Sequence, residues 1–307
     1  MGGNDPELRD GDAAAVQAFE PHRRRLRGLA YRMLGSVADA EDVVQDAYLR
    51  WHATDRRRVA DARAFLSKTV VRLCLDHLKS ARHRRESYVG PWLPEPLLDE
   101  AADPAGADID LADDLSVALL LVLERLSPLE RAAFLLHDVF DLGFAEIADA
   151  LGRNEAACRQ LAARARRHVQ SAPPRFAVPL DEGARLADAF LAASRSGDVA
   201  ALGRLLAADA VAYTDGGGRK AAALNPIRGR DKLLRFYAGL ARKAGQLFPE
   251  VVYRGRINGL AGFITVEADD TLQTTALDIR DGVIAALYIV RNPEKLAHLD
   301  RRRLAGG

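Results

Sequence analysis

The sequence predicts a multidomain protein in which two all-α helical domains precede a C-terminal α+β domain. Apolar residues recur at spacings of three and four over residues 13–86 and again over 111–170, which is the period of an amphipathic helix. Beyond residue 180, runs with a period of two indicate strands. At 307 residues the chain is long enough for two or three cores. Segments containing proline at 87–110 and 171–180 read as linkers, which places the domains at 10–86, 111–170 and 181–307.

The first domain is predicted to contain three helices, near residues 13–34, 38–52 and 61–85. Gly35-Ser36 and a polar stretch at 54–58 separate them. The third helix begins with an apolar pattern and ends in Arg82, His83, Arg84 and Arg85. We therefore expect its last part to be solvated.

The second domain is predicted to contain helices at 111–125, 127–140, 144–151 and 154–170. Ser127 is expected to cap the second of these, and Pro128 suits its first position. A short helix, a turn at Gly152 and a longer polar helix match a helix-turn-helix.

The third domain is predicted to mix helices and strands. Helices are expected at 181–196, 199–207 and 227–244, and strands at 211–213, 250–257, 262–268, 271–279 and 283–290. Arg280-Asp281-Gly282 carries the Asp-Gly signal of a hairpin turn.

Composition excludes several classes of protein. The two cysteines, Cys74 and Cys158, lie in helical patterns, and the seven histidines have no ligand spacing, so we expect neither a disulfide framework nor a metal site. The N-terminus lacks the apolar stretch of a signal peptide, and no apolar run suits a membrane span. We expect a cytoplasmic protein with no cofactor. Net charge is only +1, but it is segregated, since residues 99–114 contain seven acidic residues and no Lys or Arg.

The second helix of the helix-turn-helix offers side chains that suit DNA. Arg side chains contact phosphates or guanine edges, and Asn and Gln read adenine. The candidates are Asn154, Glu155, Arg159, Gln160, Arg164, Arg166 and Arg167, while Ala157, Cys158, Leu161 and Ala165 can pack inward. The alternative is a helix with a solvated basic face.

The first two domains together resemble the extracytoplasmic-function (ECF) group of RNA polymerase sigma factors. The resemblance rests on Ala38-Asp39-Ala40-Glu41-Asp42-Val43-Val44-Gln45-Asp46 followed by Tyr48 and Trp51, on Ser127-Pro128-Leu129-Glu130-Arg131, and on Phe144-Ala145-Glu146-Ile147-Ala148. It covers about residues 19–169 and assigns sigma region 2 to 10–86 and sigma region 4 to 111–170. It implies binding of core RNA polymerase and of the promoter minus-10 and minus-35 elements.

The resemblance also implies roles for individual residues. Core-polymerase contacts are expected from Asp39, Glu41, Asp42, Gln45, Asp46 and Trp51, although simple charge complementarity at a helix N-terminus explains the acids equally well. Minus-10 contacts are expected from Arg56, Arg57, Arg58, Arg63, Lys68, Arg72, Asp76 and Lys79. Arg72 and Asp76 lie one turn apart, so an intrahelical ion pair is an equal alternative for them. The helix-turn-helix residues named above would read the minus-35 element.

The C-terminal domain resembles the SnoaL-like, cone-shaped α+β barrels of the nuclear-transport-factor-2 (NTF2) class, which extend a subset of ECF sigma factors. Three motifs carry this resemblance: Trp92-Leu93-Pro94-Glu95-Pro96 in the linker, Asp215-Gly216-Gly217-Gly218-Arg219, and Asn292-Pro293-Glu294-Lys295-Leu296. Arg219 stands where Lys is usual and Lys220 follows, so that contact can be shifted. We expect the three motifs to lie together and to form a regulatory interface.

Two other roles for this domain are open. The Gly-rich motif could bind phosphate, but it lacks the Lys-Ser/Thr of a P-loop and favours a tight loop. Related barrels are enzymes that use a buried carboxylate, and Asp209, Glu267, Asp269 or Asp278 could supply one, although no His-carboxylate pair stands out.

The function predicted is that of a sigma factor whose C-terminal domain contacts the sigma domains and modulates their activity in cis. The alternatives are a ligand-sensing helix-turn-helix regulator that never binds polymerase, and a bifunctional protein with an enzymatic barrel. The sequence does not indicate a small-molecule ligand.

Overall fold

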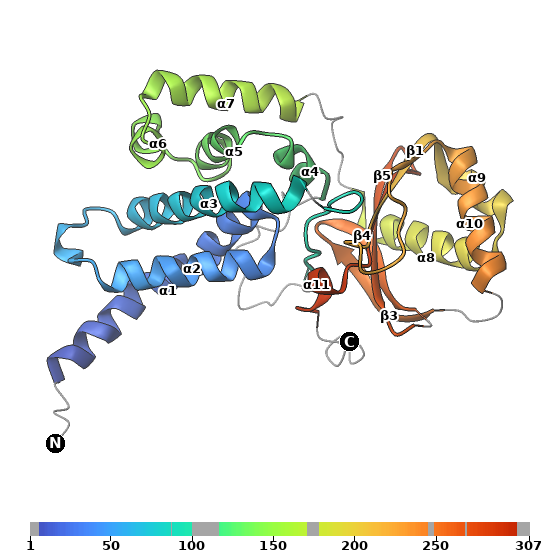
Figure 1. Cartoon of the computed structure of the whole chain (residues 1–307), viewed down its shortest axis with the longest axis horizontal. Coiled ribbons are helices and arrows are strands. Elements are labelled where there is room, and N and C mark those ends of the chain that lie inside the picture. The colour runs from blue at the N-terminus through green and yellow to red at the C-terminus, as the bar shows by residue number, and fades with distance from the viewer. Residues whose placement is uncertain are drawn as a thin grey trace. The chain divides into compact units, whose positions relative to one another are not determined.

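The structure is a computed structural model that describes residues 6–86, 88–99, 117–170, 178–244, 249–267 and 269–299 (Figure 1). The chain forms two compact units. One combines Met1–Arg84 with Leu120–Ala172, and the other combines Arg85–Leu119 with Pro173–Gly307. Apart from Asp99, the acidic run predicted as linker lies outside the described residues, as do residues 171–177 of the second linker and the basic tail 301–303.

The first three helices form the bundle that the sequence predicts. They are α1 (Pro6–Leu34), α2 (Val37–His52) and α3 (Ala62–Glu86), with a 3-10 turn at Arg56–Arg58. Ser36 begins α2, because its hydroxyl accepts the Asp39 amide at 3.2 Å. Phe19, Leu26 and Val70 are buried between the helices. The apolar residues that recur at helical spacing therefore form the core of the bundle.

The second helical domain contains α4 (Val117–Glu124), α5 (Pro128–Phe134), a π-helical turn (Leu135–Val139), α6 (Phe144–Leu151) and α7 (Glu155–Gln170). Ser127 and Glu130 form a reciprocal capping box at the start of α5, with Pro128 in its first turn. Gly152 ends α6 with a φ of 62°, a left-handed conformation that glycine adopts at little cost. The predicted helix-turn-helix is confirmed as a structural unit.

The C-terminal unit is an α+β domain built on a six-stranded sheet of order β2-β1-β6-β5-β4-β3. Its strands are β1 (Leu206–Asp215), β2 (Ile227–Arg228), β3 (Glu250–Ile257), β4 (Leu260–Val266), β5 (Leu272–Arg280) and β6 (Val283–Val290). Neighbours are antiparallel, except that β1 and β6 are parallel. Asp281 and Gly282 both have positive φ, 50° and 73°, which is the hairpin turn expected from Asp-Gly.

The helices of this unit are α8 (Leu180–Ser196), α9 (Val199–Leu205), α10 (Arg230–Ala244) and α11 (Pro293–Leu296). Two predicted helix boundaries change by more than one residue. The helix expected at 227–244 begins at Arg230, because Ile227 and Arg228 pair with β1 and Gly229 turns the chain with a φ of 91°. The helix expected at 199–207 ends at Leu205, and β1 begins at once, seven residues of it beyond the strand predicted at 211–213.

The two faces of the sheet have different neighbours. Helices α8, α9 and α10 cover one face (Figure 1), where Phe190, Leu202 and Leu233 pack on Leu277 and Leu287 in the main core. Side chains alternate along a strand, so Ala276 and Tyr288 point to the other face. None of the described helices is both long and apolar enough to cross a bilayer.

Candidate functional site

The segment at 88–99, which we name the strap, belongs to the C-terminal unit although the sequence reads it as a linker. It lies against the sheet on the face away from α8 to α10 (Figure 1). The Asn258 amide donates to the Leu97 carbonyl at 2.7 Å, and the Asp99 amide donates to the Arg256 carbonyl at 3.1 Å. Leu98 forms a β-bridge with Ile257. These backbone bonds fix one end of the strap to the β3–β4 turn.

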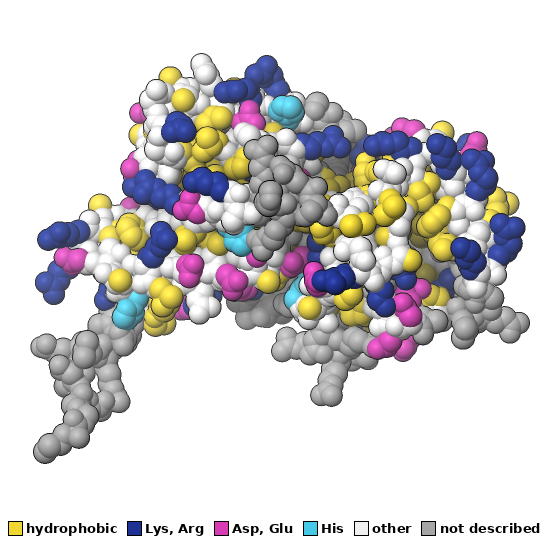
Figure 2. All heavy atoms as spheres, in the orientation of Figure 1, with side chains coloured by type: hydrophobic (Ala, Val, Ile, Leu, Met, Phe, Trp, Pro, Cys, Tyr) yellow, Lys and Arg dark blue, Asp and Glu magenta, His cyan; other side chains and the backbone are white. Residues whose placement is uncertain are grey.

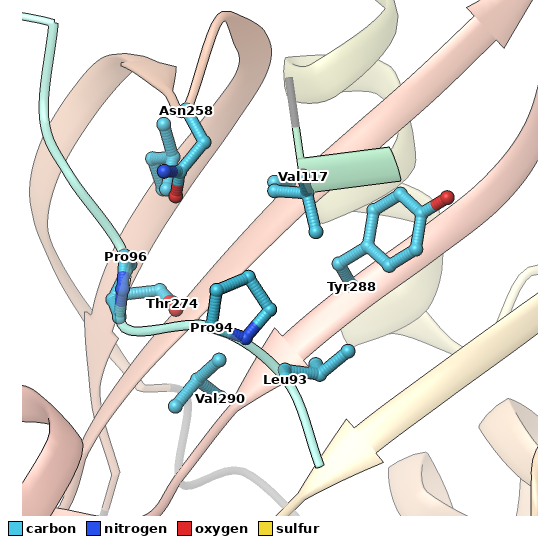
Figure 3. Close-up of a pocket in the computed structure, with 10 residues that line it drawn as sticks. Leu93, Pro94, Pro96, Val117, Asn258, Thr274, Tyr288 and Val290 are labelled. Carbon is cyan, nitrogen blue, oxygen red and sulfur yellow. The ribbon is translucent and has the colours of Figure 1, made fainter. Parts of the chain in front are cut away.

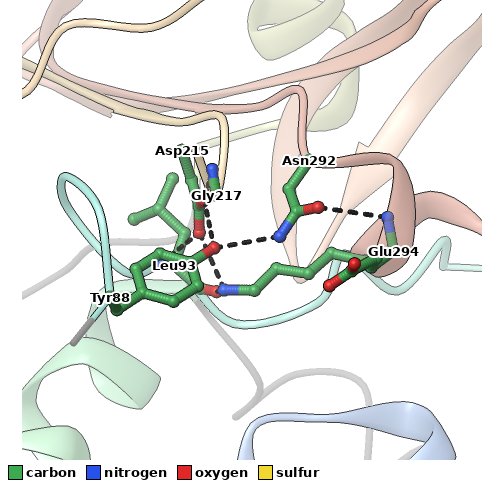
Figure 4. Close-up of polar contacts among 7 residues, drawn as sticks. Tyr88, Leu93, Asp215, Gly217, Asn292 and Glu294 are labelled. Atoms are coloured by element: carbon green, nitrogen blue, oxygen red, sulfur yellow. Dashed lines mark hydrogen bonds and ion pairs between the residues drawn. The ribbon is translucent and has the colours of Figure 1, made fainter. Parts of the chain in front are cut away.

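The other end of the strap is fixed by a buried ion pair, which we name the clasp: Asp215, Lys295 and the backbone of Leu93 (Figure 4). Asp215 Oδ2 lies 2.7 Å from Lys295 Nζ and accepts the Leu93 amide at 2.8 Å. Lys295 Nζ also donates to the Leu93 carbonyl. One residue of the strap is thus held by both of its backbone polar groups, from the end of β1 and from α11.

The surroundings of the clasp satisfy its charges. The Asp215 side chain has no exposed surface and that of Lys295 only 8%, so both depend on internal partners. Tyr88 donates to Asp215 Oδ1 at 2.5 Å and accepts from Asn292 Nδ2 at 3.0 Å. The Lys295 ammonium lies 4.1 Å from the Trp92 ring centroid, a cation–π geometry. Burial, followed by the hydrogen bond to Asp215, raises the pKa of Tyr88.

The Gly-rich motif forms the tight loop that the sequence favours. Gly217 has a φ of 58°, its amide donates to Asp215 Oδ1 at 3.0 Å, and a Cβ built on it would lie 2.3 Å from Asn292 Nδ2. The Gly217 amide, which a bound phosphate would need as a donor, is therefore already hydrogen-bonded to the Asp215 carboxylate. Arg219 pairs with Glu294 at 3.0 Å, whereas Lys220 turns to Asp269 at 2.9 Å. The Gly-rich motif thus contacts the tail motif through Arg219, which pairs with Glu294, and through Asp215, which pairs with Lys295.

The strap fills the hollow on its side of the sheet (Figure 3). The cavity that remains is about 10 Å³ in volume, about the room that one water molecule needs. The strap, the sheet with its β3–β4 turn, and the first residue of α4 line this cavity. The lining residues are Leu93, Pro94, Pro96, Val117, Ile257, Asn258, Thr274, Ala276, Tyr288 and Val290. His298 Nε2 lies 2.8 Å from the Pro96 carbonyl at the rim.

None of the four carboxylates that the sequence offers for catalysis is among the described residues lining this cavity. Asp278 is buried but pairs with Arg280 at 2.6 Å, and Asp269 pairs with Lys220. Asp209 is exposed and Glu267 is half-buried. No group of three metal-ligating side chains occurs among the described residues.

In the helical unit, basic side chains of the first domain bind carbonyls at helix ends of the second. Arg25 and Arg63 both donate to the Phe140 carbonyl, at 2.5 and 2.9 Å. Arg72 donates to the Asp149 carbonyl at 2.7 Å and to that of Ala150 at 3.1 Å. Carbonyls in the last turn of a helix attract cations, so α6 offers Arg72 a natural partner.

Two further contacts join these helical domains. Lys68 pairs with the Asp149 carboxylate, and this contact lowers the pKa of Asp149. Arg131, whose side chain is only 3% exposed, pairs with Glu124 at 2.7 Å and donates to the Met33 carbonyl at 2.5 Å.

Comparisons with known proteins agree with this architecture. Residues 18–84 match the family model of sigma-70 region 2, and residues 116–169 match that of sigma-70 region 4. The chain is 41% identical over 290 residues to the ECF RNA polymerase sigma factor SigJ of Mycobacterium tuberculosis, covering 91% of this chain and 92% of that protein. The chain belongs to the ECF RNA polymerase sigma factors.

A solved structure of SigJ and a second relative support this assignment. The crystal structure of M. tuberculosis SigJ matches with a TM-score of 0.74 and 39% identity, covering 92% of this chain and 98% of that one. The probable ECF sigma factor SigI of M. tuberculosis is 38% identical over 184 residues, 59% of this chain and 63% of that protein. The predicted class of protein, a promoter-specific initiation factor that binds RNA polymerase, is confirmed. The regulator that never binds polymerase is thereby set aside.

The sigma factor presents its predicted polymerase-binding acids on α2. Glu41, Asp42, Gln45 and Asp46 are exposed, and Asp39 lies 3.4 Å from His77. Trp51 does not share this surface. It is 2% exposed, packs on Phe65 and donates Nε1 to the Ala15 carbonyl at 3.1 Å. A side chain held in the core packs the bundle, which corrects the expected polymerase contact for Trp51.

The predicted minus-10 residues of the sigma factor divide into three groups. Arg63, Lys68 and Arg72 bind the second helical domain as described, whereas Arg57 and Arg58 are exposed in the loop and Arg56 is half-buried. Asp76 pairs with Lys79 at 2.8 Å. The alternative ion pair between Arg72 and Asp76 is not formed, because each has another partner.

On α7 the sigma factor exposes Gln160, Arg159, Arg164 and Arg167, with Cys158, Ala162 and Ala165 buried beneath. Ala157 and Leu161, predicted to pack inward, are half-buried. Asn154 accepts the Ala157 amide at 2.8 Å and so caps the helix. Arg159 pairs with Glu155 at 2.6 Å, and Arg166 pairs with Asp138 at 2.6 Å.

Sequence reasoning found the three motifs but missed several partners. Tyr88, Asn258, Thr274, Tyr288 and His298 complete the strap site, and none of them lies in a motif. Tyr88 precedes the linker motif by four residues, and an aromatic side chain beside a Pro-rich segment was the one signal available. The interdomain role of Arg131 could not be seen, because it depends on a carbonyl 98 residues away.

Proposed function

We propose that this ECF sigma factor is regulated in cis by its C-terminal domain, which holds the strap and so restrains the two promoter-binding domains. The observation that carries the proposal is the clasp, which grips the Leu93 backbone through its amide and its carbonyl. We assign polymerase binding to the exposed acids of α2, minus-10 binding to α3 and the loop before it, and minus-35 binding to α7. The strap is the part of the chain that joins these surfaces.

Chain geometry supports this role for the strap. An extended residue spans at most about 3.5 Å, so the twelve strap residues can reach up to about 40 Å, and holding them on the sheet fixes the distance between their ends. When the strap is released that distance can vary, which gives the connection between the helical domains more freedom. Clasp formation therefore limits the range of separations available to the two helical domains.

Contacts within the helical unit support the same conclusion. Arg63, Lys68 and Arg72, which we assign to promoter binding, are satisfied by Phe140, Asp149 and Ala150. A DNA phosphate would have to replace these partners. We infer that the clasped protein is the less active form.

The barrel, in this proposal, has no catalytic activity. Enzymes with related folds, as the sequence implies, use a buried carboxylate, but here Leu93 and Pro94 fill the hollow of the sheet and leave about 10 Å³. A substrate-sized molecule needs a volume of about 300 Å³ or more. Any ligand in the hollow would first displace the strap.

The test is run-off transcription with core polymerase, comparing the full-length chain with Lys295→Met and with Arg219→Ala. Both changes remove a positive charge. Lys295 binds the Leu93 carbonyl of the strap, whereas Arg219 pairs with Glu294 and does not hold the strap. We expect Lys295→Met to raise transcription and Arg219→Ala to leave it close to the wild-type level. Core-polymerase pull-down should give equal binding for all three proteins.

Limited proteolysis of the free proteins makes the result decisive. If the strap of Lys295→Met is cleaved faster while transcription stays at the wild-type level, regulation through the strap is wrong. Turnover of a substrate by the wild-type barrel, lost on replacing one of its carboxylates, would instead support an enzymatic domain.

A further inference from the structure

A second feature of the C-terminal unit lies on the opposite side of the sheet from the strap, among the helices. The last turn of α8 and the exposed face of α10 enclose an open cavity of about 590 Å³, lined by Arg195, Arg235 and Arg242 together with Ser196, Gly197, Ala238 and Ala241. We name it the arginine groove. Figure 2 shows Lys and Arg side chains spread over the helices at the right of the view, where Figure 1 places α9 and α10.

Among the described residues no carboxylate forms an ion pair with the three guanidinium groups of the groove, and Arg235 and Arg242 are exposed. Arg195 donates to the Pro249 carbonyl, and its buried Nε has no partner. Burial, followed by the charge of Arg254, lowers the pKa of Arg195, and the charge of Glu267 partly offsets this effect. An anion in the groove would add a favourable charge interaction with Arg195.

Helix dipoles explain only part of the cluster. Arg195 and Arg242 stand in the last turns of α8 and α10, where a cation complements the negative helix end. Each helix end carries only about half an elementary charge, so three guanidinium groups exceed what two helix ends need. Arg235 lies two turns before Arg242 on the same face of α10 and has no such explanation.

The remaining lining residues decide what kind of anion fits. The residues between the arginines, Gly197, Ala238 and Ala241, have small side chains or none. The two helices approach closely there, since a Cβ on Gly197 would lie 3.0 Å from the Ala241 Cβ. No large side chain therefore projects between the arginines. No aromatic ring, carboxylate or amide side chain lines the groove to recognise a base. Guanidinium groups match phosphate oxygens in a bidentate fashion. The groove is suited to phosphates and indifferent to sequence.

We propose that the arginine groove binds the phosphate backbone of duplex DNA, which gives the C-terminal domain a sequence-independent DNA contact of its own. The positive surface continues beyond the groove through Arg230, Lys232 and Lys243 on α10, with Asp231 as the one acid of that helix. An extended polyanion fits such a surface better than a compact phosphate does. The contact does not depend on the clasp or on regulation by the strap.

The experiment measures binding of the full-length protein, without polymerase, to a fluorescent duplex that lacks promoter sequence. Anisotropy titrations between about 50 and 200 mM salt give the slope of log K against log salt. Each phosphate contact contributes about 0.9 to that slope. Arg235→Ala combined with Arg242→Ala should reduce it by about 1.8 and weaken binding about tenfold or more near 100 mM salt.

The matched control is Arg185→Ala combined with Arg228→Ala, which changes net charge equally at two exposed arginines outside the groove. Arg185 lies about 15 Å from Arg195 along α8. Equal slopes for the two double variants would overturn the proposal. A thermal shift with ATP or inorganic phosphate that only the groove variant loses, with its DNA slope unchanged, would also overturn it and assign the groove to a free phosphate compound.

Discussion

Replacing Lys295 by Met is the sharpest perturbation of the C-terminal unit. The substitution keeps most of the length of the side chain but removes the only cation that contacts the buried Asp215 among the described residues. It also removes the donor to the Leu93 carbonyl. Breaking a buried ion pair by removing one partner costs about 3–5 kcal/mol. Three donors stay on Asp215, from Tyr88, Leu93 and Gly217, so we expect a value near 3 kcal/mol.

Two measurements follow the effect. For a unit of this size about 3 kcal/mol lowers the unfolding midpoint by roughly 6–12 °C, which calorimetry detects. Hydrogen exchange of peptides from the strap reports the same change locally, because the Leu93 amide is protected by Asp215. Arg219→Ala is the control. Its ion pair with Glu294 is about two-thirds exposed on both sides, and such surface pairs contribute about 0–1 kcal/mol.

A double variant separates charge from packing. If the cost of Lys295→Met comes from an unpaired carboxylate, adding Asp215→Asn should restore part of the stability, since a neutral amide requires no counter-charge. Additive losses in the double variant would refute the reasoning. So would a fall in midpoint for Lys295→Met no larger than that of Arg219→Ala.

Three further predictions concern other contacts. Gly217→Ala should lower the unfolding midpoint of the C-terminal unit by several degrees in calorimetry, because the new Cβ strains a positive φ and overlaps Asn292. The control Gly239→Ala, in open space on α10, should not lower it, and equal shifts for the two variants would contradict this prediction. Arg72→Ala should increase the separation of the helical domains, read by fluorescence transfer between dyes on α3 and α7, and unchanged transfer would show that its carbonyl contacts are dispensable. Burial and Asp215 raise the pKa of Tyr88, so the contribution of Tyr88 to stability is complete below about pH 10 and is lost as the pH rises toward the folded pKa. The difference in midpoint between wild type and Tyr88→Phe in thermal melts should therefore shrink above about pH 10. A constant difference would contradict this prediction.

The local sequence determined the secondary structure and the class of the protein. The capping residues at Ser36 and Ser127, the glycine at Gly152 and the Asp281-Gly282 turn act through neighbours within a few residues, so their effects can be read directly. The order of motifs in the two helical domains indicated a sigma factor, and the comparisons confirmed it. Three motifs were also expected to lie together, and the residues of all three meet at the clasp.

Only the tertiary structure decided what those residues contact. Asp215, Leu93 and Lys295 lie as far as 202 residues apart, and no local period shows that a linker residue will be held by a strand end and a tail helix. The same holds for Trp51, for which the resemblance implied a polymerase contact although the packing of the bundle buries it. The arginine groove gave no motif, because its three arginines come from two helices that meet only in the folded chain. Long-range packing places such groups, and a single sequence does not specify it residue by residue.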